Sequence, residues 1–261
     1  MPVASLAMYW RAETAPAYEQ LWRNTRDAMA ETSPDHLAGL PDTLLVPDDF
    51  LAHWRAPDLV LSQICGLPYR NHAADQVALV ASPVHPLPGC PPGYYNSVFV
   101  MRADDPRTDP SDWPGLRFVC NEALSQSGWA AAQNWMHARS LAFQHVFLSG
   151  AHAISARAVA LGHADIAAID AQTWQMITRW DGDLGLREIA RTEPTPGHAF
   201  ITADPALAPS LRMAVDQAIA ALSSHDRDVL NLTGLADIPR ADYEAVPTPP
   251  FPHASAQKVT L

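Results

Sequence analysis

Short apolar runs alternate along the chain with longer segments whose apolar positions recur at helical spacing. This alternation is typical of an α/β fold, in which helices cover both faces of a parallel sheet. The pattern predicts strands over residues 4–8, 43–46, 59–61, 76–81, 97–102, 117–120, 144–148, 165–169, 186–190 and 200–202. It predicts helices over 15–31, 128–139, 151–161 and 207–222, and further helices beginning at Asp48 and near Ala171.

Two polar connectors that contain proline, at 104–115 and 193–197, interrupt this pattern. The α/β unit between them is self-contained, which predicts a lobe inserted into the first, with two chain crossings that form a hinge. We therefore expect a two-lobed α/β protein in which each lobe is a mostly parallel sheet flanked by helices. The proline-rich tail from Val246 onward is expected to be poorly packed. The predicted lobes are residues 1–98 plus 197–261 and residues 99–196.

The chain has 17 Lys and Arg against 28 Asp and Glu, which gives a formal net charge of -11. A nucleic-acid binder would show a basic face, and no run of Lys or Arg exists, so we expect no nucleic-acid partner. An acidic protein can still bind an anion, because groups at the site decide affinity whereas net charge acts on steering. No apolar stretch approaches the roughly 20 residues that cross a bilayer, and we expect no membrane insertion.

The first ten residues lack the basic region and the sustained apolar core of a secretory signal. We expect either that an export signal has been removed, which makes the protein periplasmic, or that the protein works in the cytoplasm. Of three cysteines, Cys65 and Cys90 are the better candidates for a disulfide, but free thiols agree equally well with the sequence. No spacing suits a zinc site, and we expect neither a metal nor a cofactor.

In parallel α/β sheets, ligands bind beyond the carboxyl ends of the strands. The segment Ser125–Trp129 follows the predicted strand 117–120 and opens a helix. Ser127 can cap this helix, and Gly128 lets a ligand approach the backbone closely. Free backbone N–H groups and the helix dipole would then bind an oxyanion. An ordinary helix cap gives the same residues, so that interpretation stays open.

Two further strand ends carry polar residues. His152 lies in the first turn after strand 144–148, where its ring can reach a bound anion, and Ser149 is the expected N-cap. A lone histidine is more often a surface or core residue, so both interpretations are kept. Asp170 ends the apolar run 165–169. Because a buried carboxylate needs a partner, Asp170 either caps the next helix or meets a cationic group or hydroxyl of a ligand.

The comparable positions that carry polar or aromatic side chains toward the first lobe are Tyr9, Ser62, Gln63 and the run Tyr94–Ser97, which contains Tyr95. The adjacent Tyr94 and Tyr95 could ligate ferric iron, as in some two-lobed iron carriers, but no matching set of His and carboxylates is evident. Packed tyrosines whose hydroxyls are satisfied are the commoner interpretation.

The motifs of common enzymes do not occur. Ser127 lacks the Gly-x-Ser-x-Gly elbow of hydrolases, and no dinucleotide-binding glycine motif or phosphate-loop lysine is present. We therefore expect no catalytic residues and a protein that is not an enzyme. Its expected partner is a small anionic or zwitterionic molecule.

Five segments occur in a fixed order within residues 4–203: Asp58–Gly66, Tyr95–Val100, Asn121–Gly128, Ser149–Ser155 and Ala164–Asp170. In this order they resemble the phosphate/phosphite/phosphonate-type solute-binding proteins of ABC transporters. The resemblance implies the type II periplasmic-binding-protein fold with the ligand between the lobes, and it implies that Asp170 receives a ligand amine. It assigns the phosphonyl oxygens to Ser125, Ser127, Gly128, His152, Tyr9 and Tyr95.

The resemblance predicts a monomeric protein that captures a phosphonate-like or phosphate-like ligand, zwitterionic ligands included, for ABC transport, with a permease as partner. Two alternatives stay open. One is an enzyme on the same two-lobed fold, similar to those that process chorismate-derived compounds in menaquinone synthesis. The other is a cytoplasmic ligand sensor.

Overall fold

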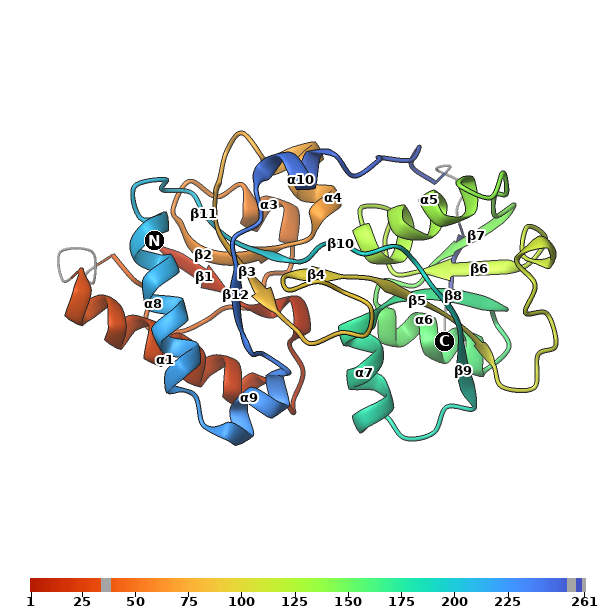
Figure 1. Cartoon of the computed structure of the whole chain (residues 1–261), viewed down its shortest axis with the longest axis horizontal. Helices are drawn as coiled ribbons and strands as arrows, with labels where there is room; N and C mark the ends of the chain where they lie inside the picture. Colours follow the sequence, from red (N-terminus) through yellow and green to blue (C-terminus); the bar gives the residue numbers. More distant parts are fainter. Residues whose placement is uncertain (34–38, 253–256, 260–261) are drawn as a thin grey trace. The chain divides into compact units, whose positions relative to one another are not determined.

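The computed structural model describes residues 1–33, 39–252 and 257–259, and the chain divides into two compact units (Figure 1). Unit 1 comprises Met1–Tyr94 and Pro196–Glu244, and unit 2 comprises Tyr95–Thr195 and Ala245–Leu261. The chain thus passes between the units at 94/95, 195/196 and 244/245. The sequence predicted two passages and placed residues 197–261 in the first lobe; the structure differs, because the end of the chain packs on unit 2.

In the described part of unit 1, five strands form one sheet in the order β1-β2-β11-β3-β12. The strands are β1 (Val3–Ser5), β2 (Leu59–Ile64), β3 (Ala78–Val84), β11 (Ala199–Thr202) and β12 (Gly234–Ala236). β1 and β2 pair in parallel, whereas β11 lies antiparallel between β2 and β3, and β12 pairs antiparallel with β3. The sheet of unit 1 is therefore mixed rather than mostly parallel, because β11 runs against both of its neighbours.

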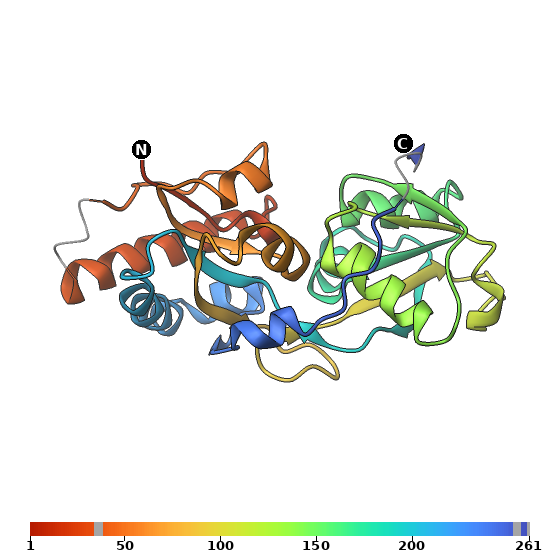
Figure 2. The ribbon, with the colours of Figure 1, turned by 90° about the horizontal axis from the view of Figure 1, so that it is seen from above.

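Two long helices of unit 1, α1 (Ala15–Thr32) and α8 (Ala208–Ala221), pack against each other (Figures 1 and 2). α1 begins at Ala15 and carries Pro16 in its first turn, where proline is tolerated. Its buried residues recur every three or four positions: Ala17, Tyr18, Leu21, Trp22, Thr25, Ala28 and Met29. The shorter helices are η1 (Ala7–Tyr9), α3 (Phe50–Trp54), α4 (Gly66–Pro68), η2 (Tyr69–Ala73), α9 (Ser224–Leu230) and α10 (Arg240–Glu244).

Two strand predictions in unit 1 are wrong. The predicted strand 4–8 ends at Ser5, and the residues after it form the 3-10 helix η1. Residues 43–46 form no strand; the Leu45 N–H donates to the Ala4 carbonyl (2.9 Å), a single contact rather than a ladder. The sequence pattern did not predict α9, β12 or α10.

In the described part of unit 2, six strands form one sheet in the order β13-β7-β6-β8-β5-β9. The strands are β5 (Ser97–Arg102), β6 (Arg117–Cys120), β7 (His145–Leu148), β8 (Ile166–Asp170), β9 (Leu186–Arg191) and β13 (Gln257–Lys258). β13, β7, β6 and β8 pair in parallel, and within this sheet β5 alone runs against the others. Every residue of β8 is buried, as expected for a central strand that is covered on both faces.

Helices cover both faces of the unit 2 sheet. In Figure 1, α5 (Ala131–His137) lies above the sheet, and α6 (His152–Ala160) and α7 (Ala171–Trp180) lie below it. The short helices η3 (Pro110–Asp112) and η4 (Gln126–Ala130) precede β6 and α5. The strands β4 (Tyr94–Tyr95) and β10 (Thr195–Pro196), at two of the chain passages, form a two-stranded sheet.

The proline-rich tail is anchored on unit 2, which corrects the prediction that it is poorly packed. The indole Nε1 of Trp129 donates to the Pro250 carbonyl (3.1 Å), and Asn134 Nδ2 donates to the Pro247 carbonyl (2.9 Å). Further along, β13 pairs in parallel with the edge strand β7. In Figure 2 the dark blue tail runs beside α5.

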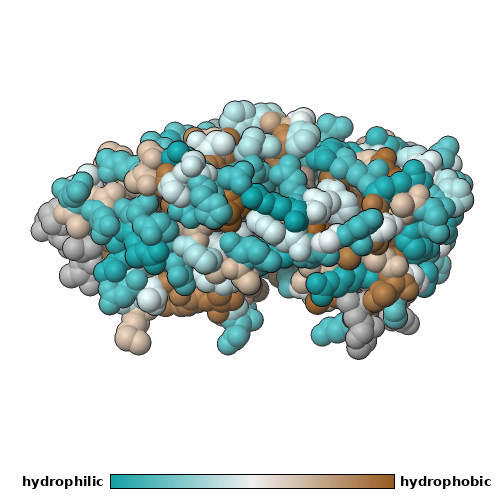
Figure 3. Space-filling view, turned by 90° about the horizontal axis from the view of Figure 1, so that it is seen from below, coloured by the Kyte–Doolittle hydropathy of each residue, from teal (hydrophilic) through white to brown (hydrophobic). Residues whose placement is uncertain are grey.

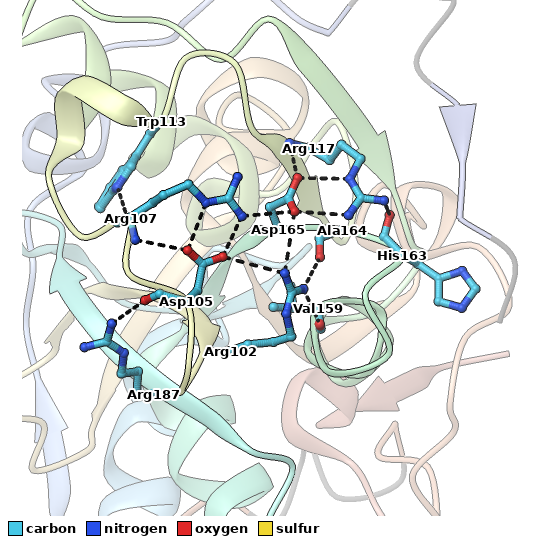
Figure 4. Close-up of polar contacts among 10 residues, drawn as sticks. All are labelled: Arg102, Asp105, Arg107, Trp113, Arg117, Val159, His163, Ala164, Asp165 and Arg187. Atoms are coloured by element: carbon cyan, nitrogen blue, oxygen red, sulfur yellow. Dashed lines mark hydrogen bonds and ion pairs between the residues drawn. The ribbon is translucent and has the colours of Figure 1, made fainter.

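Arginine and aspartate side chains form an ion network at the amino ends of β6 and β8 (Figure 4). Asp165, which directly precedes β8, accepts hydrogen bonds from the Arg117 backbone N–H and from its Nε (2.9 Å each). Arg107 pairs with both Asp105 and Asp165. The network connects the 102–117 loop to the start of two central strands, at the edge of the sheet opposite to the carboxyl ends of β6 and β8.

The face drawn in Figure 3 is mostly hydrophilic, and apolar residues occur on it in separate patches. Across the described residues, no helix has both the length and the apolar character to cross a membrane. Cys65, Cys90 and Cys120 are thiols in the described chain rather than members of a disulfide.

Candidate functional site

The predicted binding turns of unit 2 lie at one edge of its sheet. β6 is flanked by β7 and β8, all three run in parallel, and Cys120 at the end of β6 is level with Leu148 at the end of β7. The turn that contains Ser127 follows β6, the turn that contains His152 follows β7, and Asp170 ends β8. The topology therefore brings together three strand ends that the sequence singled out separately.

The turn after β6 is held by Ser125 rather than by Ser127. Ser125 is the N-cap of η4, and its Oγ accepts a hydrogen bond from the Gly128 N–H (2.9 Å). The prediction that Ser127 caps this helix is wrong, because Ser127 already lies inside the first turn and its hydroxyl points elsewhere. A Cβ on Gly128 would lie 2.0 Å from Asn121 Oδ1, so the glycine leaves room for this amide oxygen beside the turn.

The Ser127 hydroxyl instead meets His152, the first residue of α6. Ser127 Oγ and His152 Nε2 lie 2.9 Å apart, and Ser125 Oγ lies 3.4 Å from Ser127 Oγ. The N-cap of α6 is Ala151, not Ser149 as predicted; the Ser149 hydroxyl donates to the Ala151 carbonyl (2.9 Å). Two serine hydroxyls and an imidazole thus converge from two strand-to-helix turns.

The imidazole of His152 is held in its neutral form. Burial lowers the pKa of His152 to about 4, and the nearby Ala168 carbonyl opposes that shift. A neutral imidazole can either donate a hydrogen bond to the serine hydroxyl or accept one from it, depending on which ring nitrogen carries the proton. The group is therefore suited to hydrogen-bond an oxyanion without itself carrying a fixed charge.

Asp170 has a structural partner on its own helix. It is buried, and its Oδ1 accepts a hydrogen bond from the Thr173 N–H (2.9 Å), which makes it the N-cap of α7. The capping interpretation is thus confirmed for one carboxylate oxygen. A role of Asp170 toward a ligand amine stays a prediction.

Ser97, the last residue of the polar run Tyr94–Ser97, links these groups. Ser97 is the first residue of β5 and lies opposite Asp170 in the sheet. Its hydroxyl donates to the Ser127 carbonyl (2.8 Å), and its N–H donates to Thr192 Oγ1 (3.0 Å). The sequence placed Ser97 in a polar run at the start of a strand, but its position beside Asp170 follows from the antiparallel pairing of β5 with β8.

In unit 1, Tyr9 lies between two histidines that no sequence motif indicated. Its ring centroid is 5.4 Å from that of His85 and 5.0 Å from that of His198, and all three side chains are buried. Burial lowers the pKa of His85 to about 4, against the opposing effect of the Asn231 and Leu230 carbonyls. The sequence could not predict this cluster, because its three members lie in segments that are far apart in the chain.

The other predicted residues are buried as well. Ser62 Oγ lies 3.0 Å from His53 Nε2, and the Gln63 carbonyl accepts from the Trp54 indole (2.7 Å). Among the described side chains, Gln63 Oε1 is a buried atom that has no hydrogen-bond partner. Tyr95 is buried in β4. A ligand contact by any of these side chains stays a prediction.

Comparison with known proteins decides the family. The sequence model of the family described as "ABC transporter, phosphonate, periplasmic substrate-binding protein" matches residues 12–246. The chain belongs to this family. Phosphonate-family membership makes the protein a solute-binding component of ABC transport, and the family is a transporter component rather than an enzyme. The alternatives of a menaquinone-pathway enzyme or a sensor are not favoured.

Solved structures share the fold of this phosphonate-family protein at low sequence identity. PhnD1 from Prochlorococcus marinus in complex with methylphosphonate is 14% identical, covers 94% of both chains and has a TM-score of 0.68. XAC2383 from Xanthomonas citri bound to ATP is 14% identical, with 94% of both chains covered and a TM-score of 0.67. A binding protein component of an ABC phosphonate transporter from Pseudomonas aeruginosa is 14% identical, with 90% of this chain and 81% of that chain covered and a TM-score of 0.66. No curated protein sequence matches the chain.

Proposed function

We propose that the protein binds a phosphonate or phosphate-like oxyanion through the serine and histidine side chains at the carboxyl edge of the unit 2 sheet. The observation that carries the proposal is the 2.9 Å approach of Ser127 Oγ to His152 Nε2, made by two turns that follow adjacent parallel strands. The Ser125 hydroxyl completes a group of polar atoms that can share an oxyanion among them.

Family and fold support this ligand class. The family is named for phosphonate, and PhnD1, which shares the fold, was solved with methylphosphonate. Hydroxyl and imidazole groups bind a tetrahedral oxyanion through several hydrogen bonds, and bonds to a charged group are about twice as strong as neutral ones. A net charge of -11 does not oppose this, because short-range contacts dominate affinity.

A binding panel tests the proposal. Thermal shift and isothermal titration would be measured with methylphosphonate, inorganic phosphate, phosphite, methanesulfonate and glycine. We expect at least one phosphorus oxyanion to bind, and Ser127→Ala and His152→Ala each to weaken it by about 10-fold or more, since one hydrogen bond to a charged group contributes about 1.5–3 kcal/mol.

Matched controls are the exposed residues Ser111 and His137 of the same unit. Ser111→Ala and His137→Ala should bind the same oxyanion as tightly as the original protein. Failure of every phosphorus oxyanion to bind, or unchanged affinity in both site variants, would rule out the proposal.

We further propose that the protein acts as a periplasmic monomer that delivers its solute to a permease. Family membership supports the permease and the compartment, and strong net negative charge disfavours self-association. Light scattering should give the mass of one chain, 28.4 kDa; a dimer mass would contradict the monomer. Cell fractionation should recover the protein with periplasmic markers.

A further inference from the structure

The described part of the tail makes several contacts with unit 2, and two of them adjoin the binding turns. Trp129, whose Nε1 donates to the Pro250 carbonyl (3.1 Å), follows Gly128 directly and lies two residues after Ser127. The Val259 N–H donates to the carbonyl of Leu148 (2.9 Å), the last residue of β7. The first contact therefore holds the turn of Ser127, and the second holds the strand end that leads to His152.

The composition of the tail suits a stiff connection of this kind. Residues 247–252 read Pro-Thr-Pro-Pro-Phe-Pro. Proline fixes φ and carries no N–H, so such a segment is extended and offers mainly carbonyl acceptors. Because its unfolded chain has little conformational freedom to lose, ordering it costs less than ordering an ordinary loop. The indole of Trp129 and the amide of Asn134 supply donors that match these carbonyls.

The space beneath the tail shows that its attachment is localised. A cavity of about 750 Å³ lies between the tail, α5 and β7, and its lining includes Gln133, Phe147 and Phe251. Over residues 247–252 the tail is thus not packed continuously onto unit 2, and hydrogen bonds with Trp129 and Asn134 hold it there, whereas Gln257–Lys258 pair with β7.

We propose that the described parts of the tail, residues 247–252 and 257–259, are positioning elements for the ligand site: the first holds η4 through Trp129, the second holds the end of β7 through Leu148, and together these contacts set the placement of Ser127 and His152. The proposal rests on the proposed function, because it assigns this effect to the same serine and histidine. Trp129 and Val259 are positioning residues and need not touch the solute.

The test uses the full chain and removes one hydrogen-bond donor at a time. Trp129→Phe keeps an aromatic ring but loses the indole N–H, and Val259→Pro loses the backbone N–H that reaches Leu148. The matched control is Trp135→Phe, the same replacement in α5 at a residue whose ring stacks on Trp113 instead. For each variant, the imidazole NMR signals of His152 are recorded without ligand, methylphosphonate affinity by titration, and unfolding by urea.

We expect Trp129→Phe and Val259→Pro to shift the His152 signals and to weaken methylphosphonate binding roughly 3–10-fold each, the factor that corresponds to one net hydrogen bond. Trp135→Phe should lower the urea midpoint and leave both readouts unchanged. His152 signals and affinity that match the original protein in both tail variants, even with reduced stability, would overturn the proposal. If the original protein binds no phosphorus oxyanion, the proposed function fails, and the ligand-free His152 signals still decide whether the tail positions the site.

Discussion

At the scale of single residues, His152 shows how the fold tunes a side chain for its task. Its imidazole contacts the Ser127 hydroxyl in a place where burial lowers the pKa to about 4. At neutral pH the ring is therefore uncharged, and it recognises a ligand by hydrogen bonding rather than as a cation. A bound oxyanion would raise this pKa, because a nearby negative charge favours the protonated ring.

The pH dependence of His152 follows from this shift. An unfolded histidine titrates near 6.5 and the folded one near 4, so the unfolded state takes up the proton first as pH falls. We expect the contribution of His152 to stability to be constant above about pH 7 and to decline from about pH 6.5 down to 4. Urea unfolding of the original protein and of His152→Gln across this range measures it.

His85 has a similarly low pKa and contributes its own pH dependence. Only the difference in unfolding free energy between the original protein and His152→Gln therefore reports on His152. Direct NMR titration gives a second measurement. A midpoint near 6.5 for the folded His152 ring would contradict the expected burial effect. With saturating methylphosphonate, the midpoint should move upward.

Gly128 is a second residue whose role depends on its neighbours in the same turn, Asn121 and Ser125. Alanine normally stabilises a helix relative to glycine by about 1 kcal/mol. Here a Cβ would lie 2.0 Å from Asn121 Oδ1 and 3.2 Å from Ser125 Oγ. We expect Gly128→Ala to destabilise the protein by about 1–3 kcal/mol, the usual cost of overpacking, as measured by urea unfolding.

A second substitution distinguishes the effect of Asn121 from that of Ser125. Adding Asn121→Ala to Gly128→Ala removes the closest oxygen and should restore part of the lost stability, while the contact with Ser125 limits the recovery. Equal stability of the single and double variants would show that Asn121 is not the obstacle.

At the scale of secondary-structure elements, the sheet of unit 2 separates its two polar edges. The carboxyl ends of β6, β7 and β8 carry the candidate site, and the amino ends of β6 and β8 carry the ion network of Figure 4. Burial alone would raise the pKa of the Asp165 carboxyl, but its hydrogen bonds and charge interactions with Arg117 and Arg107 hold it below the usual value. The network therefore stabilises the sheet at the edge away from the site.

Asp165→Asn should lower the free energy of unfolding by about 2–4 kcal/mol, somewhat less than for a fully buried pair because Arg117 and Arg107 remain partly in water. Because the folded pKa is depressed, this stabilisation is complete above about pH 5 and is lost as the pH falls below the unfolded value near 3.9. The difference in free energy of unfolding between the original protein and Asp165→Asn, measured by urea unfolding, should therefore become smaller below about pH 4.

The surface ion pair of Asp216 with Arg212 (3.6 Å) provides the control. Asp216→Asn should cost no more than about 1 kcal/mol. Methylphosphonate affinity should stay unchanged in both variants, since neither lies at the carboxyl edge. If Asp165→Asn lowered the free energy of unfolding by no more than Asp216→Asn does, the stabilising role of the network would be contradicted.

At the scale of the whole molecule, net charge influences how fast an anion arrives. A formal charge of -11 repels a negatively charged solute at distances where salt can screen it. We expect the association rate of methylphosphonate to rise roughly two- to threefold between low salt and about 0.15 M NaCl. Stopped-flow tryptophan fluorescence measures it. A rate that falls with salt would show that local positive potential at the site outweighs the net charge.

The sequence by itself determined the features that depend on nearest neighbours. The apolar run that became β8, the helix that starts at Ala15 and the polar turns at Ser127 and His152 were all predicted, because burial, helix periodicity and turn chemistry act over a few residues. The family resemblance added the expected ligand class. The match to the family model confirmed the family, and the ligand itself stays a prediction.

Only the tertiary structure decided which segments meet. It inserted β11 between β2 and β3, gave the cap of η4 to Ser125, placed Asn121 against Gly128 and docked the proline-rich tail beside Trp129. The placement of β11 and the docking of the tail depend on contacts between residues far apart in the chain, whereas Ser125 and Asn121 lie within seven residues of Gly128 and meet it through the fold of the turn after β6. Local patterns carry no information about such partners, because many pairings satisfy the same hydrogen-bonding and burial requirements until the whole core is formed.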